Sequence, residues 1–517
     1  MRMLKTTRLV MVLFLLLTTL PACRPTMPTG TLVYGIHTQP NTLNPLLAPD
    51  IVSRWAIELV FDGLVDVNER LDIVPALAQK WQVSPDGLTW SFDLRRGVRW
   101  HDGAPFTASD VQFTYEAIFD PAAKSTLPRS DYQTIAQIET PDDYTVRFVL
   151  KEQDASLISK LTLGIVPQHL LAGQDLSRSD FNRSPVGTGP FILQEWLSLQ
   201  YLRFAANPAY FGGRPGLESL VWRIVPDTTA LFIQLLAGEV DGALVESPED
   251  AARLAAQGLK TYGVSGGNVQ ISLQLANELF QDVRVRRALA LALDRPAIIA
   301  GLLSGQGTLS AGDILPTSWA YNPQAAELYP YDPAQARALL AQAGWQPGPD
   351  GLLTKDGRKL AFTLVTDAGN HLRQQIAVTV REQWRAIGVA VDLNFVERNT
   401  FVAEYVLKGK FQAALLQSSV RADPDLSRRF HSRSIQSGQN FLNYSNSTLD
   451  YLLDRALRLN TPAERAPLYR QAQLILAQDV PQINLFYPTV YYVFKADVQG
   501  LKPSAMSVFW NAQAWTR

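Results

Sequence analysis

The stretch from residue 75 to residue 116 carries the most ordered pattern of the chain. Residues 84–87, Ser-Pro-Asp-Gly, have the composition of a tight turn, because proline fixes φ at the first central position and Asp-Gly tolerates left-handed angles. Residues 88–94 then alternate between apolar and polar side chains, which predicts a half-buried strand. Val98 and Trp100 predict a second short strand. The stretch therefore predicts a β-hairpin or meander.

Helix start and stop signals follow this hairpin and recur further along the chain. Thr107 and Asp110 form a capping-box pattern. Asp332 followed by Pro333 predicts a helix start, and Gly344 predicts its stop. The other segments with helical or strand patterns are 55–64, 376–387 and 461–478 as helices, and 32–36, 360–365 and 389–395 as strands. The strand–helix–strand order of the second half predicts an α/β lobe with helices flanking a sheet.

The N-terminus has the pattern of a targeting segment. Three basic residues precede an apolar run, 9–20, that is too short to span a bilayer. The following Leu-Pro-Ala-Cys ends at Cys23 and resembles a bacterial lipobox, which implies diacylation of that cysteine. We predict a signal peptide over 1–22 and a lipidated cysteine with a tether over 23–30. The alternative is an ordinary secretory signal with an incidental cysteine.

The rest of the chain is too long for one hydrophobic core and predicts two or three lobes. A net charge of -1, with 47% hydrophobic and 18% charged residues, gives no electrostatic footprint for nucleic acid. We therefore expect no nucleic-acid partner. Cys23 is the only cysteine, which excludes an intramolecular disulfide and a cysteine metal cluster.

Three consecutive patterns resemble the signature of solute-binding protein family 5. They are Pro-x-Leu-Ala-x-x-Trp at 75–81, Asp-Gly-x-x-x-x-Phe-x-Leu-Arg at 86–95 and Val-x-Trp-His-Asp-Gly-x-Pro-Phe-x-Ala-x-Asp-Val at 98–111. Members of the family are the extracytoplasmic binding proteins of oligopeptide, dipeptide and nickel ABC importers, and the resemblance extends from Leu32 to Asn484. In the family this signature is structural and lies away from the ligand.

The resemblance implies an α/β fold of the two-lobe periplasmic-binding-protein (Venus flytrap) type, with a satellite domain and hinge crossovers. Lobe I is expected to contain 31–50, 185–277 and 485–517, the satellite domain 51–184, and lobe II 278–484.

The resemblance also implies how such a chain works. The ligand touches both lobes only when they close, so binding favours the closed state. An ABC permease recognises that state and its ATPase subunits supply the energy. We expect a monomer without a cofactor that is lipid-anchored outside the cytoplasm, in the periplasm or at the cell surface.

The segment that ends at Asp423-Pro424, called the ligand segment here, departs from the pattern of peptide-binding relatives. There it is approximately Gly-Trp-x-x-Asp-x-x-(acid)-Pro, with the tryptophan on the ligand and the aspartate on the peptide's α-ammonium. Aligned on Asp423-Pro424, this chain has Gln417 at the tryptophan position and Val420 at the aspartate position. An ammonium without its carboxylate loses a hydrogen bond worth on the order of a few kcal/mol. A shift in register would restore an acid at Asp423.

We therefore predict a polar, uncharged or mildly cationic site. Gln417, Ser418 and Ser419 are expected to form hydrogen bonds, and Arg421 is a candidate partner for a carboxylate or phosphate. The alternative is that Arg421 points to solvent or pairs with Asp425.

Four further ligand-binding candidates come from the ends of the chain. Tyr34, Thr38 and Gln39 lie at the first strand and in the loop after it, which face the cleft in the family. Trp510, like Tyr34, is an aromatic candidate for the pocket wall, with core packing as the alternative.

The predicted function is capture of a peptide or peptide-like solute for an importer. The alternatives are a binding protein for a nickel metallophore, a sugar or an anionic small molecule, and a sensor or an enzyme on the same fold. No histidines have the i+3 or i+4 spacing of a metal motif and no G-x-S-x-G elbow occurs. The resemblance to the family implies a binding protein, so we predict no enzyme. His431, after the ligand segment, keeps the metallophore alternative open.

Overall fold

A computed structural model describes residues 30–48 and 50–517. The predicted signal peptide and Cys23 lie outside these residues. Within them, no helix combines the length and the hydropathy that crossing a bilayer requires.

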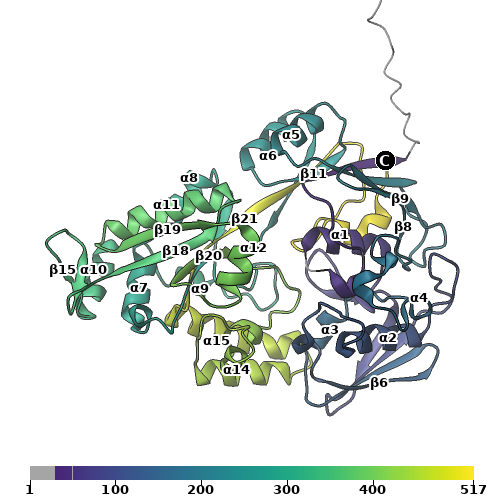
Figure 1. The fold of residues 1–517 in the computed structure, drawn as a ribbon, viewed down its shortest axis with the longest axis horizontal. Coiled ribbons are helices and arrows are strands. Elements are labelled where there is room, and N and C mark those ends of the chain that lie inside the picture. Colours follow the sequence, from purple (N-terminus) through teal and green to yellow (C-terminus); the bar gives the residue numbers. More distant parts are fainter. Residues whose placement is uncertain (1–29, 49) are drawn as a thin grey trace, which may run out of the picture.

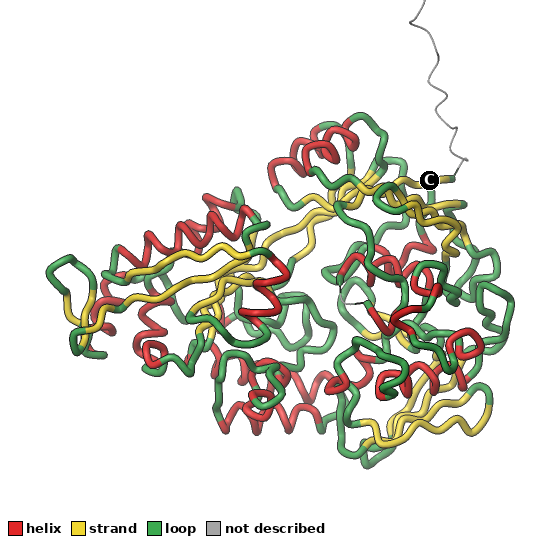
Figure 2. Tube along the Cα trace, viewed as in Figure 1, coloured by secondary structure: helices red, strands yellow, loops and turns green. Residues whose placement is uncertain are grey.

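A twelve-stranded sheet runs through two lobes (Figures 1 and 2). Its main path, in spatial order, is β19 (Ala390–Val396), β18 (Ala361–Asp367), β20 (Ala413–Gln417), β13 (Val269–Leu273), β21 (Gln482–Phe494), β11 (Gly242–Val245), β1 (Thr31–Ile36), β10 (Ser219–Ile224), β9 (Tyr201–Ala206) and β8 (Phe191–Leu197). β12 (Lys260–Ser265) and β14 (Gly307–Leu309) also pair with β21.

β21 connects the lobes. Its first residues pair with β13 and its last residues with β11 and β12. Residues 266–268, between β12 and β13, make a second crossing beside it. Two adjacent crossings leave each lobe with its own part of the sheet, and Figure 1 shows β21 running from one lobe to the other.

Each lobe has its own hydrophobic core. The largest cluster of buried side chains comes from residues 32–224 and 492–515, so the C-terminal segment packs with the N-terminal part of the chain. The second cluster comes from residues 269–486. The exact limits of lobes and satellite stay a prediction.

The satellite domain is built on a four-stranded antiparallel sheet with the order β4 (Ala78–Val83), β5 (Thr89–Leu94), β7 (Thr145–Leu150) and β6 (Ile135–Asp142). Helix α2 (Ala108–Phe119) packs on this sheet, where the ring of Tyr115 meets the edge of Phe148 at 5.2 Å. The predicted turn and strand of the hairpin are confirmed by β4 and β5.

The prediction of a strand at Val98–Trp100 is wrong. Only an isolated bridge joins Arg99 to Pro105. The chain turns back at once, because Gly103 N donates to Trp100 O, and the Trp100 indole packs inward toward Asp110. The β-pairing therefore does not continue beyond this single bridge.

Two of the predicted helix signals are confirmed and one helix is displaced. The Asp110 carboxylate accepts from Thr107 N at 3.0 Å, which completes the capping box of α2. α10 (Pro333–Gln342) begins after Asp332, and Gly344 stops it with φ of +92°. The helix predicted at 55–64 is α1 (Ile51–Val60), because Asp50 caps it earlier.

The other helices flank the sheet or connect its strands. They are α3 (Leu157–Lys160), α4 (Gln168–Leu171), α5 (Thr228–Leu236), α6 (Pro248–Ala256), α7 (Val283–Leu291), α8 (Arg295–Leu302), α9 (Gln324–Glu327), α11 (His371–Arg385), α12 (Arg398–Thr400), α13 (Ser427–Phe430), α14 (Ser447–Leu457) and α15 (Pro462–Asp479). Short strands pair as β2 (Val65–Val67) with β3 (Ile73–Pro75), and as β15 (Gln346–Pro347), β16 (Leu353–Lys355) and β17 (Arg358–Lys359).

Candidate functional site

A cavity of about 270 Å³ lies where β20 ends. β18, β19 and β20 run parallel, so their carboxyl ends share one edge of the sheet, where loops have room to carry a binding site. The segment after β20 supplies much of the wall. The lining residues are Asp313, Ile314, Leu315, Ser318, Val406, Leu407, Leu416, Gln417, Ser418, Ser419, Arg421, Asp423, Pro424, Asp425, Leu426, Arg428, Arg429, Gly438, Gln439 and Phe441.

The start of this segment is tied to the crossing at 266–268. Ser418 N donates to Asn268 O at 2.9 Å, and Gln417 Nε2 donates to Gly267 O at 3.2 Å. Within the described part of the chain, the buried Ser418 Oγ has no hydrogen-bond partner. The wall of the cavity and the connection between the lobes are therefore one continuous unit.

Asp423 is held by a buried ion pair. Arg465 of α15 approaches both of its carboxylate oxygens, and the Arg465 side chain is only 5% exposed. Burial raises the pKa of Asp423, and the charge of Arg465 opposes that rise. Because the Asp423 carboxylate is already paired with Arg465, the structure does not support the alternative alignment in which Asp423 binds the ammonium of a peptide ligand.

Arg429 lies at the inner side of the cavity. Its Nη2 donates to Ser272 Oγ at 3.0 Å, and its Nη1 lies 3.5 Å from Asp313 Oδ2. The guanidinium also stacks over the ring of Phe441 at 5.0 Å. Burial lowers the pKa of Arg429, Asp313 opposes this, and the charge of Arg421 adds to it.

Arg428 faces the other lobe. Its Nε donates to Gln439 Oε1 at 2.6 Å, and its Nη1 lies 3.4 Å from Asp131 Oδ2 of the satellite domain. Arg421 is exposed on the same wall. Asp425, its alternative partner, accepts instead from Ser427 N and Oγ at 3.0 and 2.6 Å.

The structure brings half of the predicted ligand-binding residues together. Gln417, Ser418, Ser419 and Arg421 line the same cavity. Val420, at the position of the relatives' aspartate, packs against an apolar cluster drawn from both lobes. The members of that cluster with buried side chains are Val67, Leu71, Leu315, Ala422 and Tyr487.

The other predicted ligand-binding residues lie elsewhere in the first lobe. Tyr34 is fully buried, with its ring edge-on to Phe509 at 5.0 Å, and belongs to the core. Gln39 Oε1 accepts from Leu199 N at 3.0 Å, and Thr38 Oγ1 donates to Gln39 O. Trp510 Nε1 donates to Lys502 O at 2.6 Å. None of the four lines the cavity.

Sequence reasoning missed four charged residues of this region. Asp131, Asp313, Arg428 and Arg429 all lie in or beside the cavity wall. The Arg-Arg pair soon after Asp423 was a usable signal, since it follows the ligand segment directly. No sequence pattern connects Asp131 with Arg428, because 297 positions separate them.

His431 is buried beside α14 and does not line the cavity. Its Nδ1 lies 3.4 Å from Asp450 Oδ1, and its Nε2 lies 3.3 Å from Asp454 Oδ1. Across residues 30–48 and 50–517, no group of three or more metal-ligating side chains could hold an ion.

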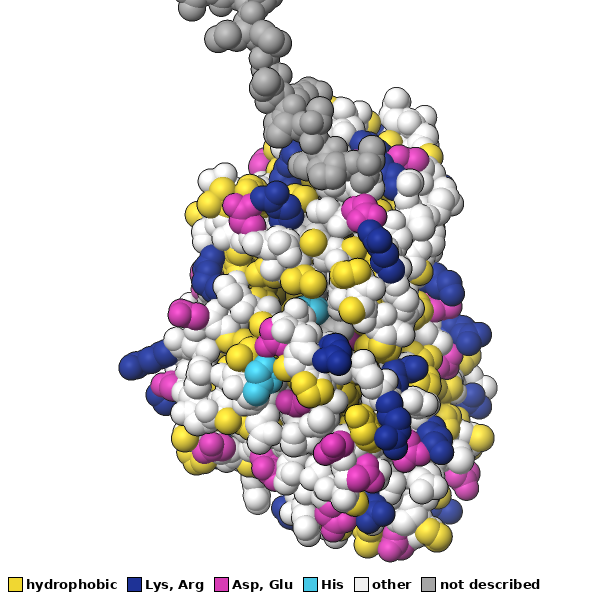
Figure 3. All heavy atoms as spheres, turned by 90° about the vertical axis from the view of Figure 1, so that its right-hand side faces the viewer, with side chains coloured by type: hydrophobic (Ala, Val, Ile, Leu, Met, Phe, Trp, Pro, Cys, Tyr) yellow, Lys and Arg dark blue, Asp and Glu magenta, His cyan; other side chains and the backbone are white. Residues whose placement is uncertain are grey.

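The surface of the first lobe and satellite has mixed charge. In Figure 3 basic and acidic side chains are interspersed among apolar ones on that face.

Comparison with known proteins decides the family. The model of the bacterial extracellular solute-binding proteins, family 5 (middle region), matches residues 72–437. This chain belongs to that family. The predicted family and the two-lobe α/β fold are thus confirmed.

Family 5 relatives align over nearly the whole chain. The oligopeptide-binding protein AppA of Bacillus subtilis is 32% identical over 497 residues, covering 94% of this chain and 91% of AppA. Its structure with a nonapeptide superposes with a TM-score of 0.81 and covers 94% of this chain and 99% of that one.

Two other similar proteins are named for, or solved with, ligands that are not peptides. The heme-binding protein A of Haemophilus influenzae is 31% identical over 504 residues, covering 91% of this chain and 89% of that protein. NikZ of Campylobacter jejuni, solved with Ni(L-His), is 28% identical and has a TM-score of 0.82. The superposition covers 95% of this chain and 100% of NikZ. The relatives are binding proteins, so this family member is a binding protein of an ABC importer rather than an enzyme.

Proposed function

We propose that this chain is the lipid-anchored, extracytoplasmic substrate-binding component of an ABC importer that delivers a peptide or peptide-like solute to its permease. The observation that carries the proposal is the position of the cavity. It opens at the carboxyl edge of the lobe II sheet, and its wall contacts the satellite domain through Arg428 and Asp131. The oligopeptide-binding relative AppA supports a peptide as cargo.

A cleft that closes around its solute explains how binding is passed on. A solute that contacts both lobes favours the closed state by its differential affinity for that state. A permease that recognises the closed shape then receives loaded protein only. The apolar contacts between Val67 and Leu71 on one side and Leu315 and Ala422 on the other are consistent with such a closed state.

The cargo is tested by native mass spectrometry of residues 24–517 without the anchor cysteine, before and after denaturation and refolding. We expect a ladder of peptide masses that disappears on refolding. Loss of peptide uptake after deletion of the gene tests delivery, and a strain that still imports the identified solute at the normal rate contradicts it.

A solute with an acidic group in place of a peptide ammonium is the second candidate. It is favoured by Val420 in the position of the aspartate and by three arginines on the cavity wall, Arg421, Arg428 and Arg429. A single non-peptide mass released from the protein supports this candidate against the first.

The lipid anchor is tested separately. Radiolabelled palmitate is expected to enter the wild-type protein and not the Cys23→Ser variant. Labelling of that variant contradicts lipidation at Cys23.

A further inference from the structure

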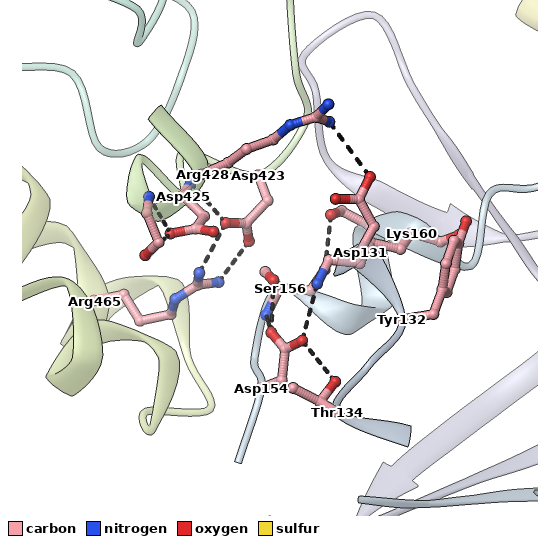
Figure 4. Close-up of polar contacts among 12 residues, drawn as sticks. Asp131, Tyr132, Thr134, Asp154, Ser156, Lys160, Asp423, Asp425, Arg428 and Arg465 are labelled. Atoms are coloured by element: carbon pink, nitrogen blue, oxygen red, sulfur yellow. Dashed lines mark hydrogen bonds and ion pairs between the residues drawn. The ribbon is translucent and has the colours of Figure 1, made fainter. Parts of the chain in front are cut away.

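The ion pair between Arg428 and Asp131 joins the cavity wall to the satellite domain (Figure 4). Arg428 is in α13, which follows the ligand segment, and Asp131 ends the short 3-10 helix Arg129–Asp131. The separation of 3.4 Å between Nη1 and Oδ2 is a long hydrogen bond, and both side chains keep about a third of their surface exposed, 36% and 28%. The pair therefore lies at the rim of the cavity.

Arg428 is also part of the cavity itself. Its Nε donates to Gln439, another lining residue, at 2.6 Å. One guanidinium thus connects two segments of the lobe II wall with a carboxylate of the opposite side. Gln439 holds the Nε side of the guanidinium, and Asp131 holds its Nη1 from the opposite side of the cavity.

The positive and negative side chains on the lobe II side of the cavity are equal in number only when Asp131 is included. That side carries Arg421, Arg428 and Arg429 on the wall and Arg465 behind it, against the three carboxylates Asp313, Asp423 and Asp425. Asp131 supplies the fourth carboxylate across the lobe boundary. Complementary charges of this kind attract the two surfaces and set their register.

Asp131 stands on a rigid support. The next residue, Tyr132, is buried against Tyr115 at 5.7 Å and donates from its hydroxyl to Lys160 O at 3.3 Å. Lys160 in turn pairs with the buried Asp154 at 2.9 Å. Figure 4 shows this chain of contacts facing Arg428 and the Asp423–Arg465 pair.

A second contact joins the same two surfaces. Ala155 N, next to Asp154, donates to Leu457 O at the end of α14 at 2.9 Å. This bond carries no net charge, so it is not screened by salt. Added salt is therefore expected to weaken the ion pair between Arg428 and Asp131 and not the hydrogen bond between Ala155 and Leu457.

We propose that Asp131 is a positioning residue for the solute site: it holds Arg428 in the cavity wall and so couples the approach of the satellite domain to completion of the site. The inference rests on the proposed binding function and adds a residue from outside the cavity to it. The ion pair acts only in the closed arrangement, so it raises the closed population before any solute binds.

The test measures closure without a solute. Spin labels are placed at Glu152→Cys in the satellite domain and Gln375→Cys in lobe II of a chain that starts at Arg24 and so has no other cysteine. Pulsed dipolar spectroscopy then reports the distance between them. We expect Asp131→Asn to lower the ratio of closed to open molecules about two- to fivefold, the range that a partly exposed ion pair supports.

Salt and charge reversal separate positioning from a general loss of structure. Raising the salt to about 1 M is expected to open the wild type and to leave D131N unchanged, because only the ion pair is screened. The pair D131R and R428D in one chain is expected to restore closure. Asp93→Asn, which removes one charge from the exposed Lys80–Asp93 pair of the satellite sheet, is the matched control and is expected to behave as wild type.

The proposal is overturned if D131N and wild type have the same distance distribution at low salt, or if D93N opens the molecule equally. These readings use neither a solute nor a permease. If the wild type closes through Asp131 but imports nothing, the proposed function alone is refuted. If the D131N variant imports normally and is as closed as the wild type, this inference alone is refuted.

Discussion

The guanidinium of Arg465 donates to both carboxylate oxygens of Asp423, with 2.7 Å from Nη1 to Oδ2 and 2.8 Å from Nη2 to Oδ1. Nη2 also donates to the Tyr469 hydroxyl at 2.9 Å, and the guanidinium lies 5.4 Å from the centre of the Trp319 ring. Asp423 Oδ1 also accepts a hydrogen bond from Asp425 N in the cavity wall. The ion pair with Arg465 therefore attaches the middle of this wall to α15. Such two-point geometry is specific to arginine.

Removal of Arg465 should therefore destabilise the whole lobe. We expect Arg465→Met to lower the free energy of unfolding by about 3–5 kcal/mol, because it leaves the Asp423 carboxylate buried without a cation. Urea denaturation followed by tryptophan fluorescence measures this. Arg465→Met combined with Asp423→Leu should recover much of the loss. A single variant within about 1 kcal/mol of wild type would contradict a buried, structural pair.

The fold was largely predictable because its signals are local. The alternation of residues 88–94 and the capping box at Thr107 depend on neighbours in sequence, and both are present. The failure at Val98–Trp100 has a physical reason. An apolar pair suits a strand or a buried turn equally well, and only contact of Trp100 with Asp110 decides between them.

The site was predictable only in part. Gln417, Ser418, Ser419 and Arg421 follow one strand, so their common location follows from the chain itself. Tyr34 shows the limit, because an aromatic residue at a strand end packs into a core or lines a cleft depending on remote residues such as Phe509. Asp131 shows it again, since its partner is fixed by the docking of two domains.

Arg421 should matter for binding and not for folding. Its side chain is exposed on the cavity wall, so Arg421→Ala removes a cation without leaving a buried carboxylate. We expect at least about a tenfold weaker affinity for the solute recovered from the protein, equivalent to about 1.4 kcal/mol, with the melting temperature unchanged. Calorimetric titration and thermal unfolding measure the two effects. Arg458→Ala, an exposed arginine outside the cavity, is the control, and equal affinities for both variants would dismiss Arg421 from the site.

Glu58 should make stability depend on pH. Burial raises the pKa of Glu58 to about 8, with Ser507 opposing and Asp66 adding to the rise, and its Oε2 has no partner among the described residues. The folded state therefore keeps a proton that the unfolded state has lost between the ordinary carboxyl pKa and about 8. Stability is highest below this window and falls as pH rises through it.

The melting temperature is accordingly expected to fall from pH 5 to pH 9, and to fall less in Glu58→Gln. Asp66, whose pKa burial raises to about 7, should leave part of the slope in that variant. Asp175→Asn is the control. Hydrogen bonds from Lys124 and Ser177 lower the pKa of Asp175 to about 2, so its contribution is constant over this range. A slope in E58Q equal to that of wild type would show that Glu58 does not titrate there.

Gly267 should connect hinge geometry to binding. A Cβ at this position would overlap Ser418 O, which is backbone and cannot turn away. The two segments are also joined by hydrogen bonds from Ser418 N to Asn268 O and from Gln417 Nε2 to Gly267 O. Gly267→Ala must therefore push the ligand segment away from the crossing. We expect a loss of about 1–3 kcal/mol in stability, typical of overpacking, together with loss of the retained solute.

Gly301→Ala is the matched control for this substitution. Gly301 lies inside α8, and a Cβ there meets no atom within 4 Å. Alanine favours a helix over glycine by about 1 kcal/mol, so this variant should melt at or above the wild-type temperature and keep its solute. Thermal unfolding and native mass spectrometry of both variants give the comparison. If G267A melts and binds as wild type, the crossing and the ligand segment move independently, and closure of the lobes could not shape the cavity through this contact.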